Sequence, residues 1–167
     1  MVPARAEMLV TEPLPLMSIT AVDGNGLYGR QTLRGNLAYG GGPHEWLDEF
    51  EDHPLPPHAT SPLTRNIAAR LVQLLPKVRH ARVIRSWAGF IENTPDGRPI
   101  LDALPSRSNV TLATMSGVGF GLSPAVGHVV QQFVMQGHCD FADVGTLRLA
   151  RFAKLEPEWV DIQGWRG

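Results

Sequence analysis

The stretch VTLATMSGVGFGLSPAVGHVVQQFVMQG, residues 110–137, combines three patterns that decide the fold. Residues 110–114 are a short apolar run typical of a strand, residues 116–124 contain three glycines, and residues 125–136 repeat apolar side chains at helical spacing. The order predicts a strand, a glycine-rich loop and a helix. Because glycine has no Cβ, such a loop lets another molecule approach the backbone. The free N–H groups and the positive dipole end of the helix favour a phosphate, a carboxylate or an electron-rich ring.

The composition is that of a soluble globular protein. A length of 167 residues with 43% hydrophobic and 19% charged residues favours one folded domain over disorder. A net charge of −1 gives no electrostatic reason to expect nucleic acid or an anionic membrane as a partner. No apolar run has the length of a membrane span, and the first residues lack the apolar core of a secretory signal. We therefore expect a cytoplasmic protein.

The first part of the chain predicts an antiparallel meander. Four runs have strand character, at residues 6–12, 17–22, 27–33 and 36–40. The turn Asp23-Gly24-Asn25-Gly26 supplies the positive φ angles of a tight hairpin. Within the third run Tyr28 and Arg30 share one face, because side chains alternate along a strand.

An acidic, proline-rich segment follows at residues 43–59 and contains His44, His53 and His58. Histidines and carboxylates are suitable metal ligands, so a metal site is conceivable. The spacing matches no compact ligand motif, and long segments of this composition are usually solvated loops. We favour the loop and expect no metal.

The remaining chain predicts mixed short elements. A helix opens at residues 60–62, where Ser61 can cap it and Pro62 suits the first helical position, and Pro76 ends it. A strand-rich run at 80–92 precedes a turn. The expected later elements are a returning hairpin arm at 98–101, a turn at 106–109, a helix end at Gly137 and a short helix at 144–152. The fold class is α+β, with an antiparallel or mixed sheet and a few helices.

Four motifs in this order resemble one family. They are RAEMLVTEP at residues 5–13, YGRQT at 28–32 with glycines at 40–42, RSWAGFIENTPDG at 85–97 and SGVGFGLSPAVG at 116–127. Together they resemble the C-terminal half of the FAD-dependent D-amino acid oxidase superfamily, in the branch of glycine, sarcosine and D-amino acid oxidases and dehydrogenases. The resemblance implies FAD as the cofactor. It also implies a substrate-binding sheet domain at 1–109, a flavin-contacting strand, loop and helix at 110–152, and a tail at 153–167, together forming one compact unit.

The resemblance lacks one part of the family pattern. No G-x-G-x-x-G follows a strand with a ribose-binding acid about 20 residues later. Gly117-Val118-Gly119 is followed by Leu122 where a third glycine would stand. We therefore expect the N-terminal Rossmann unit that binds the ADP part of FAD to come from a partner chain or a missing half. The sheet face and the loop would otherwise be uncovered, so we also expect a homo- or hetero-oligomer.

The resemblance also implies site residues, although it identifies no catalytic residue. The residues expected to contact the flavin ring are Gly117, Val118, Gly119, Phe120, Gly121 and Ser123. The residues expected to contact a small amine or amino acid are Tyr28, Arg30, Arg85 and Trp87. An arginine can hold a substrate carboxylate in a bidentate pair. Two alternatives stay open: the glycine loop could simply pack tightly, and Arg85 could be a buried partner of a core acid.

The implied reaction is oxidation of the C–N bond of an amino acid or secondary amine of the D-amino acid, glycine, sarcosine or hydroxyproline type. Two departures from the family bear on it. Val118 stands where many relatives have His, and Gly121 stands where sarcosine oxidases often have a Lys associated with oxygen activation. The second departure favours a dehydrogenase over an oxidase. The alternative is a truncated, non-catalytic paralogue that binds a ligand or partner as an oligomer.

Overall fold

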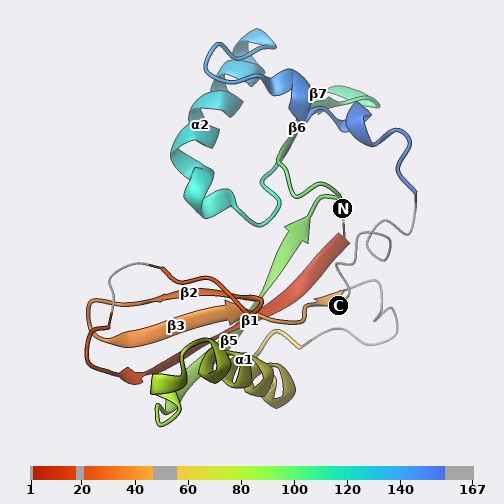
Figure 1. The fold of residues 1–167 in the computed structure, drawn as a ribbon. Coiled ribbons are helices and arrows are strands. Elements are labelled where there is room, and N and C mark those ends of the chain that lie inside the picture. Colours follow the sequence, from red (N-terminus) through yellow and green to blue (C-terminus); the bar gives the residue numbers. More distant parts are fainter. Residues whose placement is uncertain (1, 18–20, 47–55, 157–167) are drawn as a thin grey trace. The chain divides into compact units, whose positions relative to one another are not determined.

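The computed structural model describes residues 2–17, 21–46 and 56–156 (Figure 1). Compact contacts divide the chain into two units, and the division falls between Phe90 and Ile91. We call residues 4–90 the sheet unit, and the chain from Ile91 onward, which groups with the first three residues, the loop–helix unit. The sequence placed its functional division later, after Asn109.

The sheet unit is an antiparallel sheet in which β1 (Val2–Pro13) joins the free edge of a hairpin formed by β2 (Leu27–Gln31) and β3 (Asn36–Gly41). Its core order is β2, β3 and β1. The short β4 (Glu45–Trp46) continues along the edge of β1 that β3 occupies, since Gly40 pairs with Met8 and Glu45 with Arg5. β5 (Val83–Asn93) pairs with β1 on its other edge. The α+β class is confirmed, but the predicted meander is wrong, because β1 pairs with β3 instead of with the next run in the sequence.

Two strand predictions in this unit need correction. Residues 18–20 lie outside the described chain, and Ala21 makes only an isolated bridge to Arg30 instead of continuing a strand at 17–22. The acidic segment predicted as a loop contains β4, because Glu45 and Trp46 pair with Arg5 and Ala4 of β1. The local composition of the segment could not show this partner, which lies far away in the sequence.

The helix α1 (Ser61–Leu74) covers one face of the sheet (Figure 1). It buries Ile67 and Leu71 against a core that also contains Leu9, Leu27, Leu37, Tyr39 and Val78. The N-cap is Thr60, which has extended backbone, so the predicted cap at Ser61 is wrong. The helix ends before Pro76, as predicted, and a 3-10 turn η2 (Pro76–Val78) follows.

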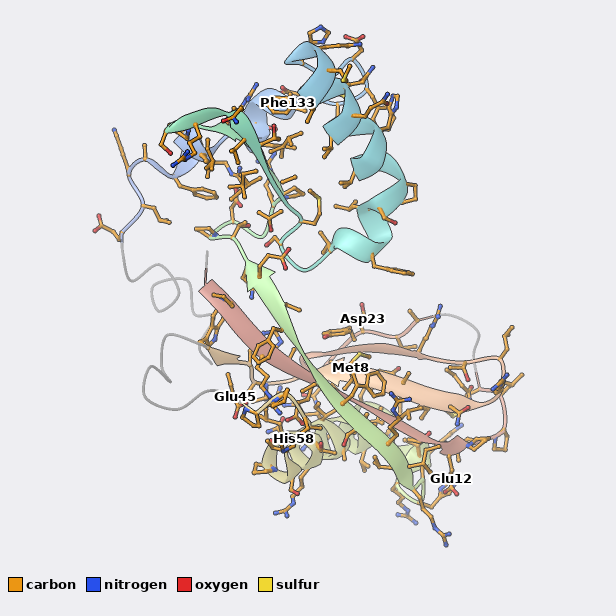
Figure 2. The ribbon with its side chains drawn as sticks, turned by 180° about the vertical axis from the view of Figure 1, so that it is seen from behind. Met8, Glu12, Asp23, Glu45, His58 and Phe133 are labelled. Atoms are coloured by element: carbon orange, nitrogen blue, oxygen red, sulfur yellow. The ribbon has the colours of Figure 1, made fainter. Side chains whose placement is uncertain are left out.

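A buried ion pair joins this helix to the sheet. The side chains of Arg5 and Glu7 are both 0% exposed and lie 2.6 Å apart. Arg5 also binds Glu45 and donates to the backbone carbonyl of His58; Figure 2 shows Glu45 and His58 near each other. Glu7 accepts from the N–H of Thr60 at 2.6 Å, which places a carboxylate at the N-terminus of α1. The pair therefore fixes the helix start and the strand register together.

The loop–helix unit contains a two-stranded hairpin. Its strands are β6 (Ile100–Leu104) and β7 (Arg107–Thr114), and the turn lies at Pro105 and Ser106. Arg107 already pairs with Leu104, so the turn predicted at 106–109 is wrong. The predicted returning arm at 98–101 starts only at Ile100, and it pairs with β7.

The helix α2 (Gly119–Gln136) begins earlier than the sequence predicted. The expected loop extended to Pro124, because proline normally stands at a helix start. Here Pro124 lies inside the helix, where it removes the N–H that would bond to the carbonyl of Phe120. The hydroxyl of Ser123 donates to that carbonyl at 2.8 Å instead, so the helix continues.

The predicted end of α2 is confirmed at Gly137, which has φ 77° and donates its N–H to the carbonyl of Phe133 at 2.9 Å. The predicted last helix at 144–152 consists of two 3-10 turns, η3 (Val144–Leu147) and η4 (Leu149–Phe152). The core of this unit is small: Leu101, Phe133 and Val144 form a buried cluster, and Ile100 is also buried. No described helix is both long and apolar enough to cross a membrane.

Candidate functional site

The glycine loop between β7 and α2 has a constrained backbone. Ser116 and Gly117 have φ angles of 50° and 76°, so two consecutive residues are left-handed. Such a conformation is uncommon for a serine and persists when its surroundings hold it. Ser116 is buried, and its Oγ accepts from the N–H of Thr94 at 3.0 Å and lies 3.0 Å from the Oγ1 of Thr94. The turn after β5 therefore holds this loop.

A carboxylate at the end of β5 supplies the second anchor. Glu92 accepts from the Oγ1 of Thr114 at 2.9 Å and from the N–H of Met115 at 3.3 Å. Burial alone would raise the pKa of Glu92. Hydrogen bonds from its own N–H, from Thr114 and from the N–H groups of Gly117 and Met115 outweigh burial and hold the pKa below its usual range. The inner N–H groups of the loop are thus satisfied by an ionised side chain of the same unit.

The N–H groups at the start of α2 do not bond to Glu92. The N–H of Val118 bonds to the carbonyl of Met115 at 3.1 Å, so it is not free to donate to a ligand. The first N–H groups of a helix have no acceptor within the helix, and in α2 these belong to Gly119, Phe120 and Gly121. Among the described residues, no side chain caps this end, and the first turn contains no acid. The arrangement leaves a positive helix end available to an electron-rich group.

The surface beside this helix end is open and apolar. The side chain of Phe120 is 98% exposed, and a Cβ added at Gly121 would meet no atom within 4 Å. Glycine in a helix costs about 1 kcal/mol relative to alanine, and nothing in the described chain requires Gly121. An apolar cavity of about 160 Å³, lined by residues that include Leu122 and Val126, lies behind the same turn. These features fit the close approach of a flat ring from outside the chain.

The sheet unit presents a second candidate surface on the face of β2 that carries Tyr28 and Arg30. Gly40 lies between Tyr28 and Met8 in the pairing of β2, β3 and β1. A Cβ at Gly40 would approach Met8 Cγ to 2.6 Å and Tyr28 Cε2 to 3.2 Å, so both side chains occupy the space above this glycine. Partial burial raises the pKa of Tyr28, which favours the neutral phenol. The predicted Tyr28 and Arg30 therefore lie together, with Tyr28 positioned by Gly40.

The other two predicted substrate residues lie at the opposite edge of the sheet. Arg85 is exposed and stacks over the ring of Trp87 at 5.4 Å from its centroid, so the buried ion pair considered for Arg85 is not what the structure has. β5 is separated from β2 by three strand spacings, or about 14 Å. The structure thus brings Tyr28 to Arg30 and Arg85 to Trp87, and it keeps the two pairs apart.

The histidine-rich segment gives no metal centre in the described part of the chain. His53 lies outside it, and no group of three or more His, Cys, Asp or Glu side chains among the described residues is arranged to hold a metal. Burial lowers the pKa of His44, and the carbonyl of His58 binds Arg5.

Sequence reasoning missed the residues that hold the loop: Glu92, Thr94 and Ser116. A signal existed for Ser116, which directly precedes the glycine-rich run. Nothing in the sequence singled out Glu92 within its strand-rich run, because its hydrogen-bond partners lie 22 and 23 residues away in the chain.

An open sheet face with an arginine can bind a carboxylate, and a glycine loop with an open helix N-terminus can bind an electron-rich group. A comparison with protein families identifies the family to which the chain belongs. The family model DAO, FAD dependent oxidoreductase, matches residues 1–133. The chain belongs to this family of FAD-dependent oxidoreductases, and the family's cofactor is FAD.

Curated relatives are similar over most of this chain. FAD-dependent oxidoreductase domain-containing protein 1 of Xenopus laevis is 30% identical over 144 residues, which cover 81% of this chain and 28% of that protein. Sarcosine oxidase subunit beta of Rhizobium meliloti (strain 1021) is 25% identical over 127 residues, covering 76% of this chain and 29% of that protein. The chain thus spans less than a third of these relatives.

Solved structures share the fold. L-proline dehydrogenase from P. horikoshii superposes with a TM-score of 0.76 at 22% identity, covering 93% of this chain and 41% of that one. Glycine oxidase from Geobacillus kaustophilus superposes with a TM-score of 0.73 at 24% identity, covering 89% of this chain and 39% of that one.

Proposed function

We propose that this chain supplies the substrate-facing sheet and the flavin-ring-facing loop of an FAD-dependent enzyme that oxidises the C–N bond of an amino acid or a secondary amine. The observation that carries the proposal is the open N-terminus of α2 at Gly119, Phe120 and Gly121, which Glu92 and Ser116 hold from behind. FAD, when bound, supplies the acceptor for the two electrons of the oxidation.

The helix end would act on the charge of the ring. Reduction of a flavin adds negative charge to its pyrimidine side, and a helix N-terminus stabilises such charge. In α2 the donors would be the N–H groups of Gly119, Phe120 and Gly121, and the exposed ring of Phe120 would cover the approach. Ser123 acts within the helix, through its bond to the carbonyl of Phe120, and not as a direct donor.

On the sheet unit, Arg30 would hold the substrate carboxylate, and the neutral phenol of Tyr28 would flank the amine-bearing carbon. The pair Arg85 and Trp87 would line the opposite edge of the same sheet. These roles follow from the positions of the side chains on the sheet and from the chemistry of a carboxylate ligand.

We assign the reaction to a dehydrogenase that passes electrons to an acceptor other than oxygen. Gly121 stands where a lysine would promote the reaction with oxygen, and a Cβ added there would meet no atom within 4 Å. A relative named sarcosine oxidase subunit beta is a subunit by its name, which supports work in a complex. We further propose that the chain works with partner subunits in the cytoplasm.

The ADP-binding part of the site would come from outside the matched fold. The described strands form an antiparallel sheet and a hairpin, and they contain no parallel βαβ unit that would bind the pyrophosphate of FAD. We propose that a further segment or a partner chain provides this unit and covers the exposed Phe120, Val134 and Met135.

The test is isolation of the protein with its native partners from the source organism. We expect a complex with flavin absorbance that reduces a dye with an amino acid or secondary amine and reacts slowly with oxygen. A colourless protein, whose assembly neither takes up FAD nor oxidises any such amine, would support the alternative of a non-catalytic ligand- or partner-binding module.

A further inference from the structure

A groove on the sheet unit continues beyond Arg30 toward the β2–β3 turn. Its volume is about 630 Å³, and its lining includes Val10, Arg30, Thr32, Arg34 and Asn36. Two of the lining residues stand on different strands, since Ala38 of β3 pairs with Arg30 of β2 and with Val10 of β1. The groove is thus a feature of the sheet, and the turn closes one end of it.

The charged side chains that line this groove are all positive. None of the described lining residues is acidic, and two are arginines. In the described chain neither Arg30 nor Arg34 takes part in an ion pair, whereas Arg5, Arg148 and Arg151 each bind a carboxylate. Two guanidinium groups beside one groove with no counter-charge favour an anionic ligand, and each can bind a carboxylate through two parallel hydrogen bonds.

A buried hydroxyl adds an independent observation. The Oγ1 of Thr32 is buried and has no hydrogen-bond partner among the described residues. The backbone of Thr32 is fully used by the turn, since its N–H donates to the carbonyl of Asn36 and its carbonyl accepts from Gly35. An unsatisfied buried hydroxyl is costly, so a rotation of the Thr32 side chain that turns the hydroxyl toward a ligand oxygen in the groove would relieve that cost.

We propose that the groove binds a ligand with two carboxylate groups, one held by Arg30 and the other by Arg34 and Thr32. The inference rests on the proposed function, because it makes the first carboxylate that of the amino acid substrate and adds a second acidic group at a distance. A volume of about 630 Å³ exceeds what one small monocarboxylate needs and lies within the usual size of ligand pockets. The substrate class would then be amino or imino acids with an acidic side chain or N-substituent.

The experiment is a titration of the full 167-residue chain with succinate and with butyrate at constant ionic strength, followed by backbone amide chemical shifts. We expect shifts centred on residues 30–36 and a dissociation constant about tenfold lower for succinate, the factor that one further favourable contact gives. Arg34→Gln should reduce the ratio to about twofold or less without weakening butyrate, while Arg79→Gln, an exposed arginine outside the groove, should leave the ratio unchanged.

Equal affinity for the two acids, shifts elsewhere in the chain, or the same loss of succinate binding in both variants would overturn the proposal. These outcomes are independent of the amine oxidation test. A complex could oxidise neutral amino acids while succinate fails to bind, which would contradict the dicarboxylate proposal and leave the proposed function intact. Succinate could also bind in the groove of a chain that never oxidises an amine, which would sink the proposed function alone.

Discussion

The sheet unit and the loop–helix unit each place an ionic group behind a helix start, but they differ in how much of their surface they satisfy themselves. In the sheet unit the pair Arg5 and Glu7 is fully buried, and α1 packs on a core of seven buried residues. In the loop–helix unit the buried cluster contains three residues, and the first turn of α2 carries an almost fully exposed Phe120. The comparison indicates that the sheet unit has the larger apolar core of the two, whereas the first turn of α2 leaves a large apolar side chain exposed.

The largest expected effect concerns the buried pair of the sheet unit. Glu7→Ala removes one of the two carboxylates that pair with the buried guanidinium of Arg5, and we expect the free energy of unfolding to fall by about 3 kcal/mol. Urea unfolding of the full chain, followed by amide signals of residues 4–90, measures it. Glu156→Ala, at an exposed position, is the control. A loss of less than about 1 kcal/mol in Glu7→Ala would remove the contrast between the units.

The next prediction compares two phenylalanines of α2. Phe133→Ala removes the largest side chain of the small core, and we expect a loss of about 3 kcal/mol in the unfolding free energy of the loop–helix unit. Phe120→Ala should change it by about 0.5 kcal/mol or less, because that ring is exposed. The same urea unfolding experiment, followed by the amide signals of residues 91–156, measures both losses. Equal losses in both variants would show that Phe120 serves packing within the chain.

A smaller effect is expected on the open face of the sheet. Gly40→Ala places a Cβ within contact of Tyr28 and Met8, and overpacking of this kind costs about 1–3 kcal/mol. The ring signals of Tyr28 should shift with it. Gly89→Ala is the matched control, since a Cβ there meets nothing within 4 Å. If both variants behave alike, Gly40 does not position Tyr28.

The smallest effect concerns the anchor of the loop. Glu92→Gln keeps the shape but removes the charge, and we expect a loss of about 1 kcal/mol near pH 7. The folded-state pKa of Glu92 is depressed, so its stabilisation is present above the unfolded value and is lost as pH falls through the folded value. The difference between wild type and variant should therefore shrink under acidic conditions. A difference that is constant down to acid pH would mean that charge plays no part.

The sequence predicted the elements whose signals are local. The Asp-Gly and Asn-Gly turn marks the hairpin before β2, apolar spacing marks α1, and Gly137 marks the end of α2. It also predicted the glycine loop and the face shared by Tyr28 and Arg30, because alternation along a strand is a local rule.

What the sequence could not predict depends on contacts between distant residues. The spacing of Arg5 and Glu7 shows that they share a strand face, but their burial depends on Thr60 and on Glu45, which lie in other segments. The early start of α2 depends on the hydroxyl of Ser123, which takes over the carbonyl that Pro124 leaves unpaired. The sequence rule that proline stands at a helix start predicted a later start, because the hydrogen bond from Ser123 cannot be inferred from the sequence alone.

The central claim is that the open helix end at Gly119, Phe120 and Gly121 faces a flavin ring, and lumiflavin, which carries the ring without the ADP part, tests it most directly. Backbone amide shifts of the full chain are measured as lumiflavin is added, with Phe120→Ala as the comparison variant. We predict weak binding with shifts confined to residues 117–123 and weakened further in Phe120→Ala. Lumiflavin that leaves these amides unchanged, or that binds equally well to the variant, would contradict the claim.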